Sequence, residues 1–180
     1  KKTSIEPGGM KAEDVFVLRS GPKLERLKIQ EPKSEIKRGK KFMVGYLGVI
    51  GQQEGIEYLL KAAKYVKELP ERNDVFWGIV GGGPDLERMK KLCHEMGLDD
   101  IVEFTGRVPD QKLLDYLNTA DVCVNCDEYN AMNDKSTMNK VLEYMALGKP
   151  LVQFDLTEGR YSAQDASLYA EHNNANDMAR

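Results

Sequence analysis

From residue 42 onward, short apolar segments alternate with stretches that have the periodicity of amphipathic helices, and this alternation constrains the fold more than any other feature. Several of the apolar segments carry branched or aromatic residues at successive positions, as in the run VFWGIV at 75–80. Strands that are apolar on both faces are typical of a parallel sheet whose crossover helices cover both sides. With right-handed crossovers, the pattern predicts an α/β fold: a doubly wound, Rossmann-like parallel sheet with helices on both faces.

The expected elements can be placed by residue number. Strands are expected at 42–47, 75–80, 101–104, 122–124, 151–154 and 168–170. Helices are expected at 54–69, 84–96 and 110–119, and a further helix is expected to open at Ser136. Ligands of such sheets bind beyond the carboxyl ends of the strands. Those ends fall in loops rich in glycine or polar residues, at 48–51, 81–84, 106–109 and 126–135.

The helix that opens at Ser136 has the clearest start and stop signals. Its apolar residues share the spacing of one buried helix face: Met138, Val141, Leu142 and Met145. Gly148 suits a left-handed C-terminal cap, and Pro150 prevents the helix from continuing. Free N–H groups at a helix N-terminus can bind phosphate, and Glu143, one to two turns further on, can bind a sugar hydroxyl. The segment therefore predicts a nucleotide-sugar site.

Charge and cysteine content exclude several other classes. The net charge of −3 leaves no broad basic field, so nucleic acid is not an expected partner, and the cluster at 37–41 is interpreted as a solvated linker. Cys123 and Cys126 form a single CxxC pair that straddles a strand end. A zinc site needs a second pair, so these thiols, like Cys93, are expected to be buried and structural. His94 and His172 are expected at the surface, and no metal site is predicted.

Two parts of the chain differ in character. Residues 1–41 are predicted to be the end of a preceding domain, with a strand at 15–18, followed by an interdomain linker. Residues 42–180 are predicted to be a nucleotide-sugar (donor) binding domain that is truncated at its C-terminus. The chain opens without an initiator Met, and its last residues begin a helix, so an excised fragment of a longer protein is expected.

Segments in a fixed order carry a family resemblance: YLGVIGQQEG, IVGGGPDLERMKKLCHEMGL, IVEFTGRVP, LLDYLNTADVCV and VLEYMALGKPLV. Together they resemble the C-terminal nucleotide-binding domain of retaining glycosyltransferases with two Rossmann domains, the GT-B type of group 1. That family includes bacterial lipopolysaccharide and exopolysaccharide mannosyl- and glucosyltransferases. The segment RSGPKLERL near the start resembles the stretch that enters the second domain in this family.

The first loop departs from the family pattern. In the resembling enzymes it reads G-R-L-x3-K-G, and its Arg and Lys bind the donor diphosphate. Here Gly48 and Gly55 match the glycines, but Val49 and Glu54 stand at the positions of the two cations. Gly51 is expected to compensate by exposing backbone N–H groups to the diphosphate. The departure indicates either a subfamily with a rearranged site, which we favour, or a site that has lost its function.

The family's Glu-x7-Glu motif is half kept. Glu143 corresponds to its second Glu, which binds the nucleotide ribose, whereas Lys135 replaces the first, which contacts the donor sugar. Asp134 is the candidate for the lost sugar contact, and Lys135 is a candidate for the positive charge missing from the first loop. The backbone N–H groups of residues 136–139 are expected to bind phosphate. The predicted donor-binding residues in this stretch are therefore Ser136, Thr137, Met138 and Asn139. Capping by Ser136 and Thr137, and core packing by Met138, are alternative interpretations of these side chains.

Two further loops complete the predicted pocket. Gly82 and Gly83 are expected to line the nucleotide pocket, although a tight turn into the next helix explains them equally well. A dinucleotide-binding motif would need a third glycine where Leu86 stands. The resemblance places Arg107 under the base, with an ion pair at the surface as the alternative.

The resemblance implies transfer of a sugar from a nucleoside diphosphate sugar, UDP- or GDP-linked, with retention of configuration. No cofactor beyond this donor substrate is expected, and no catalytic residue is assigned in this chain. The acceptor site is expected on a missing N-terminal domain, so the chain alone should bind nucleotide weakly and turn over nothing. The expected location is the cytoplasm, with lipid-linked acceptors for cell-envelope polysaccharide bringing the full-length protein to the inner membrane face. A non-hydrolysing sugar epimerase, a glycogen phosphorylase-like protein and a non-catalytic interaction module are the alternatives.

Overall fold

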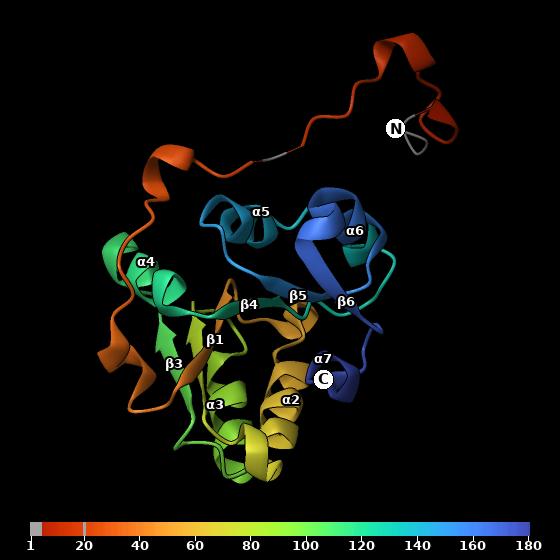
Figure 1. Cartoon of the computed structure of the whole chain (residues 1–180). Helices are drawn as coiled ribbons and strands as arrows, with labels where there is room; N and C mark the ends of the chain where they lie inside the picture. The colour runs from red at the N-terminus through yellow and green to blue at the C-terminus, as the bar shows by residue number, and fades with distance from the viewer. Residues whose placement is uncertain (1–4, 20) are drawn as a thin grey trace.

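A single parallel sheet organises the computed structural model, which describes residues 5–19 and 21–180 (Figure 1). Its strands lie in the order β3-β2-β1-β4-β5-β6. Their bounds are β1 (Phe42–Leu47), β2 (Val75–Val80), β3 (Val102–Gly106), β4 (Val122–Asn125), β5 (Leu151–Phe154) and β6 (Ser167–Ala170). All neighbouring strands pair in parallel, so the predicted doubly wound α/β sheet is confirmed.

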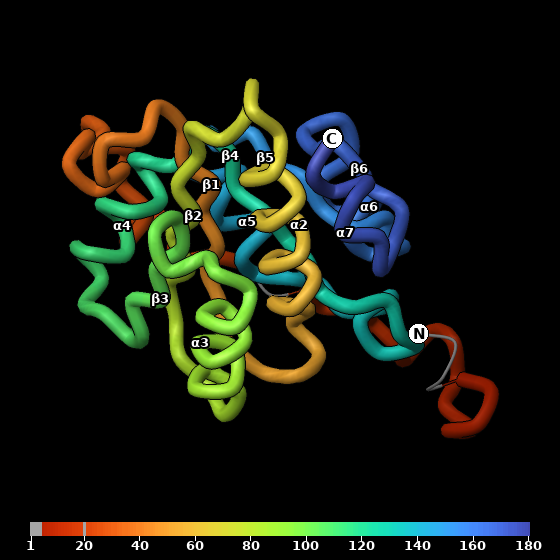
Figure 2. Tube along the Cα trace, turned by 90° about the horizontal axis from the view of Figure 1, so that it is seen from below, coloured from red at the N-terminus to blue at the C-terminus, as the bar shows by residue number. Residues whose placement is uncertain are grey.

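Helices cover both faces of this sheet. One face carries α2 (Ile56–Glu68), α3 (Leu86–Glu95) and α7 (Ala175–Met178), which lie nearest the viewer in Figure 2. The other face carries α4 (Asp110–Thr119), α5 (Asn139–Ala146) and α6 (Thr157–Ala163) (Figure 1). Alternate strand residues feed the two cores, since Val124 and Cys126 pack under the first group of helices and Cys123 packs under the second.

The strand order reverses direction beside β1, and this reversal positions the site. β2 and β3 extend from one edge of β1, whereas β4, β5 and β6 extend from the other. β1 pairs with β4 only at Val44 and Gly45, so the two strands separate toward their carboxyl ends. The buried Tyr144 hydroxyl fills the gap, because it accepts a hydrogen bond from Leu47 N (2.8 Å) and lies 3.2 Å from Val124 O. A crevice at this switch point is where α/β sheets bind their ligands.

The helix predicted from Ser136 begins three residues later than expected. Residues 136–138 are extended, and α5 starts at Asn139. Its buried face is formed by Val141 and Tyr144, and Met145 is exposed, so the predicted apolar face was partly wrong. The C-terminal signal is confirmed: Gly148 has φ 64°, and Lys149 N donates to Tyr144 O across the cap.

Two other element predictions differ from the structure. Residues 15–18 are not a strand, because nothing in the described chain pairs with them, and Phe16 and Leu18 are exposed. The short helix α6 was not predicted.

Residues 28–38 do not hang free as a solvated linker but pack along α4. Lys37 forms an ion pair with Asp121 (2.8 Å), and Arg38 forms one with Glu103 (2.8 Å). The cations predicted to be solvated therefore attach this segment to the sheet domain. The domain boundary at residue 41 remains a prediction.

Candidate functional site

The glycine loops meet at the carboxyl edge of the sheet, and their backbones touch. A Cβ atom on Gly81 would lie 1.8 Å from Gly48 O, and one on Gly83 would lie 2.3 Å from Ile50 O. At Gly55 a Cβ atom would lie 1.8 Å from Cys126 O. These glycines allow the loops after β1, β2 and β4 to approach closely. The close packing supports the tight-turn interpretation of Gly83, while a ligand contact for Gly82 and Gly83 remains a prediction.

A pocket of about 310 Å³ opens beside the switch point between β1 and β4. Its walls come from the loop after β1, the loop after β4 and the start of α5. The lining residues are Val49, Gln53, Glu54, Asp127, Met132, Asn133, Ser136, Met138 and Lys140. Two of the predicted site residues, Ser136 and Met138, therefore do line a pocket at the expected edge. We refer to it as the switch-point pocket.

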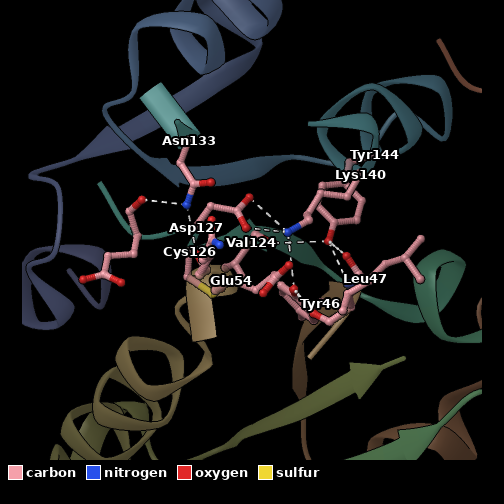
Figure 3. A network of polar contacts seen from close by, with 12 residues as sticks. Tyr46, Leu47, Glu54, Val124, Cys126, Asp127, Asn133, Lys140 and Tyr144 are labelled. Carbon is pink, nitrogen blue, oxygen red and sulfur yellow. Dashed lines mark hydrogen bonds and ion pairs between the residues drawn. The ribbon is translucent and has the colours of Figure 1, made fainter. Parts of the chain in front are cut away.

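The wall of this pocket holds a buried ion pair that the sequence did not reveal (Figure 3). Lys140 Nζ lies 2.9 and 3.0 Å from the two carboxylate oxygens of Asp127. The side chains are only 10% and 3% exposed. Asp127 lies two residues after the end of β4, and Lys140 is in the first turn of α5, so the pair joins the end of this strand to that helix.

Tyr46 completes the network around Lys140. Its hydroxyl donates to Val49 O (2.9 Å) and accepts a longer hydrogen bond from Lys140 Nζ (3.3 Å). Burial raises the pKa of Tyr46 well above its usual value, so the hydroxyl stays neutral. The ammonium also lies 4.9 Å from the centroid of the Tyr46 ring. All three N–H donors of Lys140 thus have an acceptor, and the one to Tyr46 is the most weakly bound.

The polar residues before α5 hold their own loop together. Asp134 accepts a hydrogen bond from Thr157 N (2.8 Å) at the start of α6. Ser136 Oγ donates to Met132 O (2.7 Å), and Thr137 Oγ1 donates to Glu158 (2.8 Å). Neither Ser136 nor Thr137 caps α5. Their ligand contacts, and that of Asp134, remain predictions.

One of the backbone N–H groups expected to bind phosphate already has a partner within the chain, and phosphate binding by the others remains a prediction. Ser136 N donates to Asn133 O (3.1 Å), because residues 133–135 form a 3₁₀ turn and the α-helix begins only at Asn139. The backbone N–H groups that could donate hydrogen bonds to an anion would therefore come from the first turn of α5 itself. Asn139 and Lys135 are exposed.

Glu143 lines a second, smaller pocket of about 30 Å³ together with Arg26, Asp110 and other residues. Arg26 forms a bidentate ion pair with Asp110 at 3.0 and 2.6 Å. Burial raises the pKa of the Glu143 carboxyl, and the nearby Arg26 partly opposes the rise. The structure therefore places Glu143 in a different pocket from Ser136 and Met138.

The remaining predicted residues lie along the carboxyl edge. Arg107 is exposed, and its Cγ would lie 3.1 Å from a Cβ atom on Gly82. The Glu54 carboxylate lies beside Gly51, 2.7 Å from where its Cβ would be. Gly48 leaves room for the Tyr46 hydroxyl and for Lys140 Cε. The acid at position 54 thus lies against the glycine that was expected to bind phosphate.

The thiols and histidines behave as the sequence predicts. Cys123 and Cys126 lie in opposite cores, and burial raises the pKa of each thiol to about 12. His94 and His172 are exposed. Among residues 5–19 and 21–180 there is no cluster of three or more His, Cys, Asp or Glu that could hold a metal ion. No helix in the described chain combines the length and the apolar character that a membrane span requires.

Comparisons with a family model and with known sequences agree on the family to which the chain is similar. Residues 28–180 match the family model described as glycosyl transferases group 1. An uncharacterized glycosyltransferase of Methanocaldococcus jannaschii is 31% identical over 110 residues, covering 61% of this chain and 26% of that protein. A GDP-mannose-dependent alpha-(1-6)-phosphatidylinositol monomannoside mannosyltransferase of Mycobacterium tuberculosis is 41% identical over 76 residues, covering 41% of this chain and 20% of that protein. The chain thus matches about a quarter or less of the length of these relatives.

Comparison with solved structures supports the fold. The Anabaena protein HepE, crystallised with UDP and glucose, has a TM-score of 0.79 at 17% identity, covering 99% of this chain and 49% of that one. The catalytic domain of a cholesterol-alpha-glucosyltransferase from Helicobacter pylori has a TM-score of 0.60 at 26% identity. In that match 77% of this chain and 81% of the other are covered.

Proposed function

The chain belongs to the glycosyl transferases group 1 family, and from that membership we propose that it is the donor-binding domain of a retaining glycosyltransferase. The donor would be a nucleoside diphosphate sugar. UDP in the structure of the Anabaena neighbour and GDP-mannose in the name of the mycobacterial relative support this donor class. The acceptor site and the complete activity would require a further domain on the N-terminal side.

The position of the switch-point pocket is the observation that carries this proposal. It lies where β1 and β4 diverge at the carboxyl edge, and the first turn of α5 forms part of its wall. In such a site the barrier to sugar transfer falls when the charge on the departing diphosphate is stabilised. We assign that task to the backbone of α5 and a neighbouring cation, and we assign ribose binding to Glu143. Glu143 would then position the donor rather than transfer a proton.

The names of two relatives support a proposal about the acceptor and, through it, about the location of the reaction. They include a lipopolysaccharide core biosynthesis glycosyltransferase of Rhizobium meliloti and the mycobacterial phosphatidylinositol mannoside enzyme. We therefore propose a saccharide or lipid-linked acceptor of the cell envelope. The reaction would then take place in the cytoplasm, at the inner face of the membrane.

Calorimetric titration with UDP, GDP and ADP tests the donor proposal directly. At least one of the three is expected to bind about tenfold or more tightly than ribose 5-phosphate, the non-nucleotide control. Glu143→Ala should weaken nucleotide binding, whereas Glu68→Ala, an exposed change on α2, should not. Equal binding of all three nucleotides and the control would contradict the proposal.

A non-catalytic binding module is the second candidate, because one observation favours it. Glu54 places a carboxylate in the switch-point pocket where the resembling enzymes carry a cation. If the full-length protein binds no nucleotide, this candidate replaces the first. If it binds a nucleotide and transfers the sugar of a labelled donor to an acceptor, the module is excluded.

A further inference from the structure

The switch-point pocket has a charge arrangement that the family pattern does not predict. Val49 and Glu54 leave the first loop without its two cations. Lys140 is the one positively charged side chain that lines the pocket, among the residues that the structure describes. The lysine reaches this position from α5 rather than from the first loop, and it is paired with Asp127.

We propose that Lys140 is the cation that binds the donor diphosphate in this chain, and that Asp127 holds it in place and limits its charge. The proposal rests on the donor function proposed above. It assigns the lost role of the first loop to a residue from a different element. Lys135, the other candidate for that role, is exposed on the turn before α5 and does not line the pocket.

The hydrogen bonds around Lys140 indicate how a phosphate would be accommodated. The two contacts to Asp127 are 2.9 and 3.0 Å, whereas the contact to the Tyr46 hydroxyl is 3.3 Å. A phosphate oxygen can replace Tyr46 as the third acceptor without breaking the pair with Asp127. Tyr46 keeps its own hydrogen bond to Val49 O, so the exchange leaves no buried polar group without a partner.

Asp127 sets the strength of this interaction. A buried ammonium with no counter-ion is costly, so the carboxylate stabilises Lys140 in the empty pocket. The same carboxylate also weakens the attraction for a diphosphate, because its negative charge offsets the positive charge of Lys140. Glu54 adds a further negative charge to the pocket. Removing the charge of Asp127 should therefore strengthen diphosphate binding, and removing the charge of Lys140 should weaken it.

Paired titrations of the whole chain with UDP and uridine, and with GDP and guanosine, test this inference. Lys140→Met should weaken binding of the diphosphate by about tenfold or more and leave nucleoside binding unchanged. Asp127→Asn should strengthen diphosphate binding several-fold, also with no change for the nucleoside. Lys64→Met, an exposed change on α2, is the matched control and should change neither. Lys135→Met tests the rival candidate and should weaken diphosphate binding less than Lys140→Met does.

The double variant Lys140→Met, Asp127→Asn guards against a loss of folding. Removing both partners of a buried ion pair is tolerated better than removing one. The double variant should therefore fold and bind nucleoside as the original chain does, yet bind the diphosphate weakly. Diphosphate binding equal to that of the original chain, or a larger loss in Lys135→Met than in Lys140→Met, would overturn the inference. If the original chain binds none of the nucleotides, it is the proposed donor function that fails.

Discussion

The hydroxyl of Tyr144 shows how a single group holds the switch point together. It is fully buried and bridges Leu47 N and the carbonyl of Val124, where β1 and β4 no longer pair. Tyr144→Phe keeps the ring and leaves those backbone groups without their partner, which should lower the free energy of unfolding by about 1–3 kcal/mol. Urea denaturation measures the loss. Tyr161→Phe, an exposed tyrosine on α6, should change it by no more than about 0.5 kcal/mol.

Glu143 gives a prediction about pH. Burial raises the pKa of its carboxyl above the ordinary 4.5, so the folded protein retains a proton that the unfolded chain has already lost. Ionised Glu143 therefore costs stability above its folded pKa, and the cost disappears as the pH falls below the ordinary value. Glu143→Gln should raise the free energy of unfolding at pH about 7 and have little effect at pH about 4.

Glu158 provides a control of opposite sign for that measurement. Its hydrogen bond with Arg19 lowers the pKa of its carboxyl, so its contribution to stability is present at neutral pH and is lost as the pH falls through the folded pKa. Glu158→Gln should therefore destabilise the protein at pH about 7 and have less effect in acid. The same sign for Glu143→Gln and Glu158→Gln would contradict this account of Glu143.

Sequence patterns could identify single residues only where a local rule applied. Gly148 was predicted because a helix C-terminus needs a left-handed residue, and the structure has one there. The ion pair between Lys140 and Asp127 could not be predicted, because it depends on how α5 packs near the end of β4. The available signal was weak: an acid in the loop after a buried strand and a lysine in the next helix.

At the scale of elements, the loops after β1 and β2 must touch for the site to form. Gly81→Ala would place a Cβ atom 1.8 Å from Gly48 O, at a residue with φ 138°. The clash is with backbone, so it should cost about 3 kcal/mol or more and disturb the loop. Gly97→Ala is the matched control, since Gly97 also has a positive φ (68°) but open space around it, and it should cost only about 1–2 kcal/mol. Equal losses in urea denaturation would show that the close approach is unimportant.

The elements that were predicted well have strong periodic patterns, and the others do not. The bounds of β1, β2, α4 and β5 agree with prediction because the apolar patterns of these segments gave clear signals. α6 has the sequence TEGRYSA, with little apolar content, and is positioned by its neighbours: Asp134 binds Thr157 N at its start. The same tertiary contact shapes the turn before α5, which explains why α5 starts later than its apolar pattern indicated.

For the molecule as a whole, the alternation of strands and helices predicted the doubly wound class but not the strand order. The order depends on which way the chain crosses after each strand, and it places β4 beside β1. The site could therefore be predicted as the carboxyl edge of the sheet, whereas the crevice between β1 and β4 and the separate pocket of Glu143 required the structure.

The attachment of residues 28–38 to α4 is the other property of the whole molecule that the sequence did not predict. Asn118 is buried, and its amide binds both Gln30 N (3.1 Å) and Lys28 O (3.1 Å). Thr119, also buried, accepts a hydrogen bond from Lys33 N (2.9 Å). This segment therefore packs against the sheet domain, although the apolar pattern of the sheet begins only at residue 42.

Two truncated chains test this arrangement. A chain that starts at Lys28 keeps the contacts of Asn118 and Thr119. It should lose no more than about 1–2 kcal/mol of unfolding free energy, because both ion pairs that it gives up are made by exposed arginines. A chain that starts at Lys40 removes only twelve more residues. It gives up the three hydrogen bonds between the segment and the side chains of Asn118 and Thr119, and it should lose a further 2–4 kcal/mol, about 1 for each bond. Urea denaturation of the three chains measures both steps, and equal stability of the two truncated chains would show that the segment merely rests on α4.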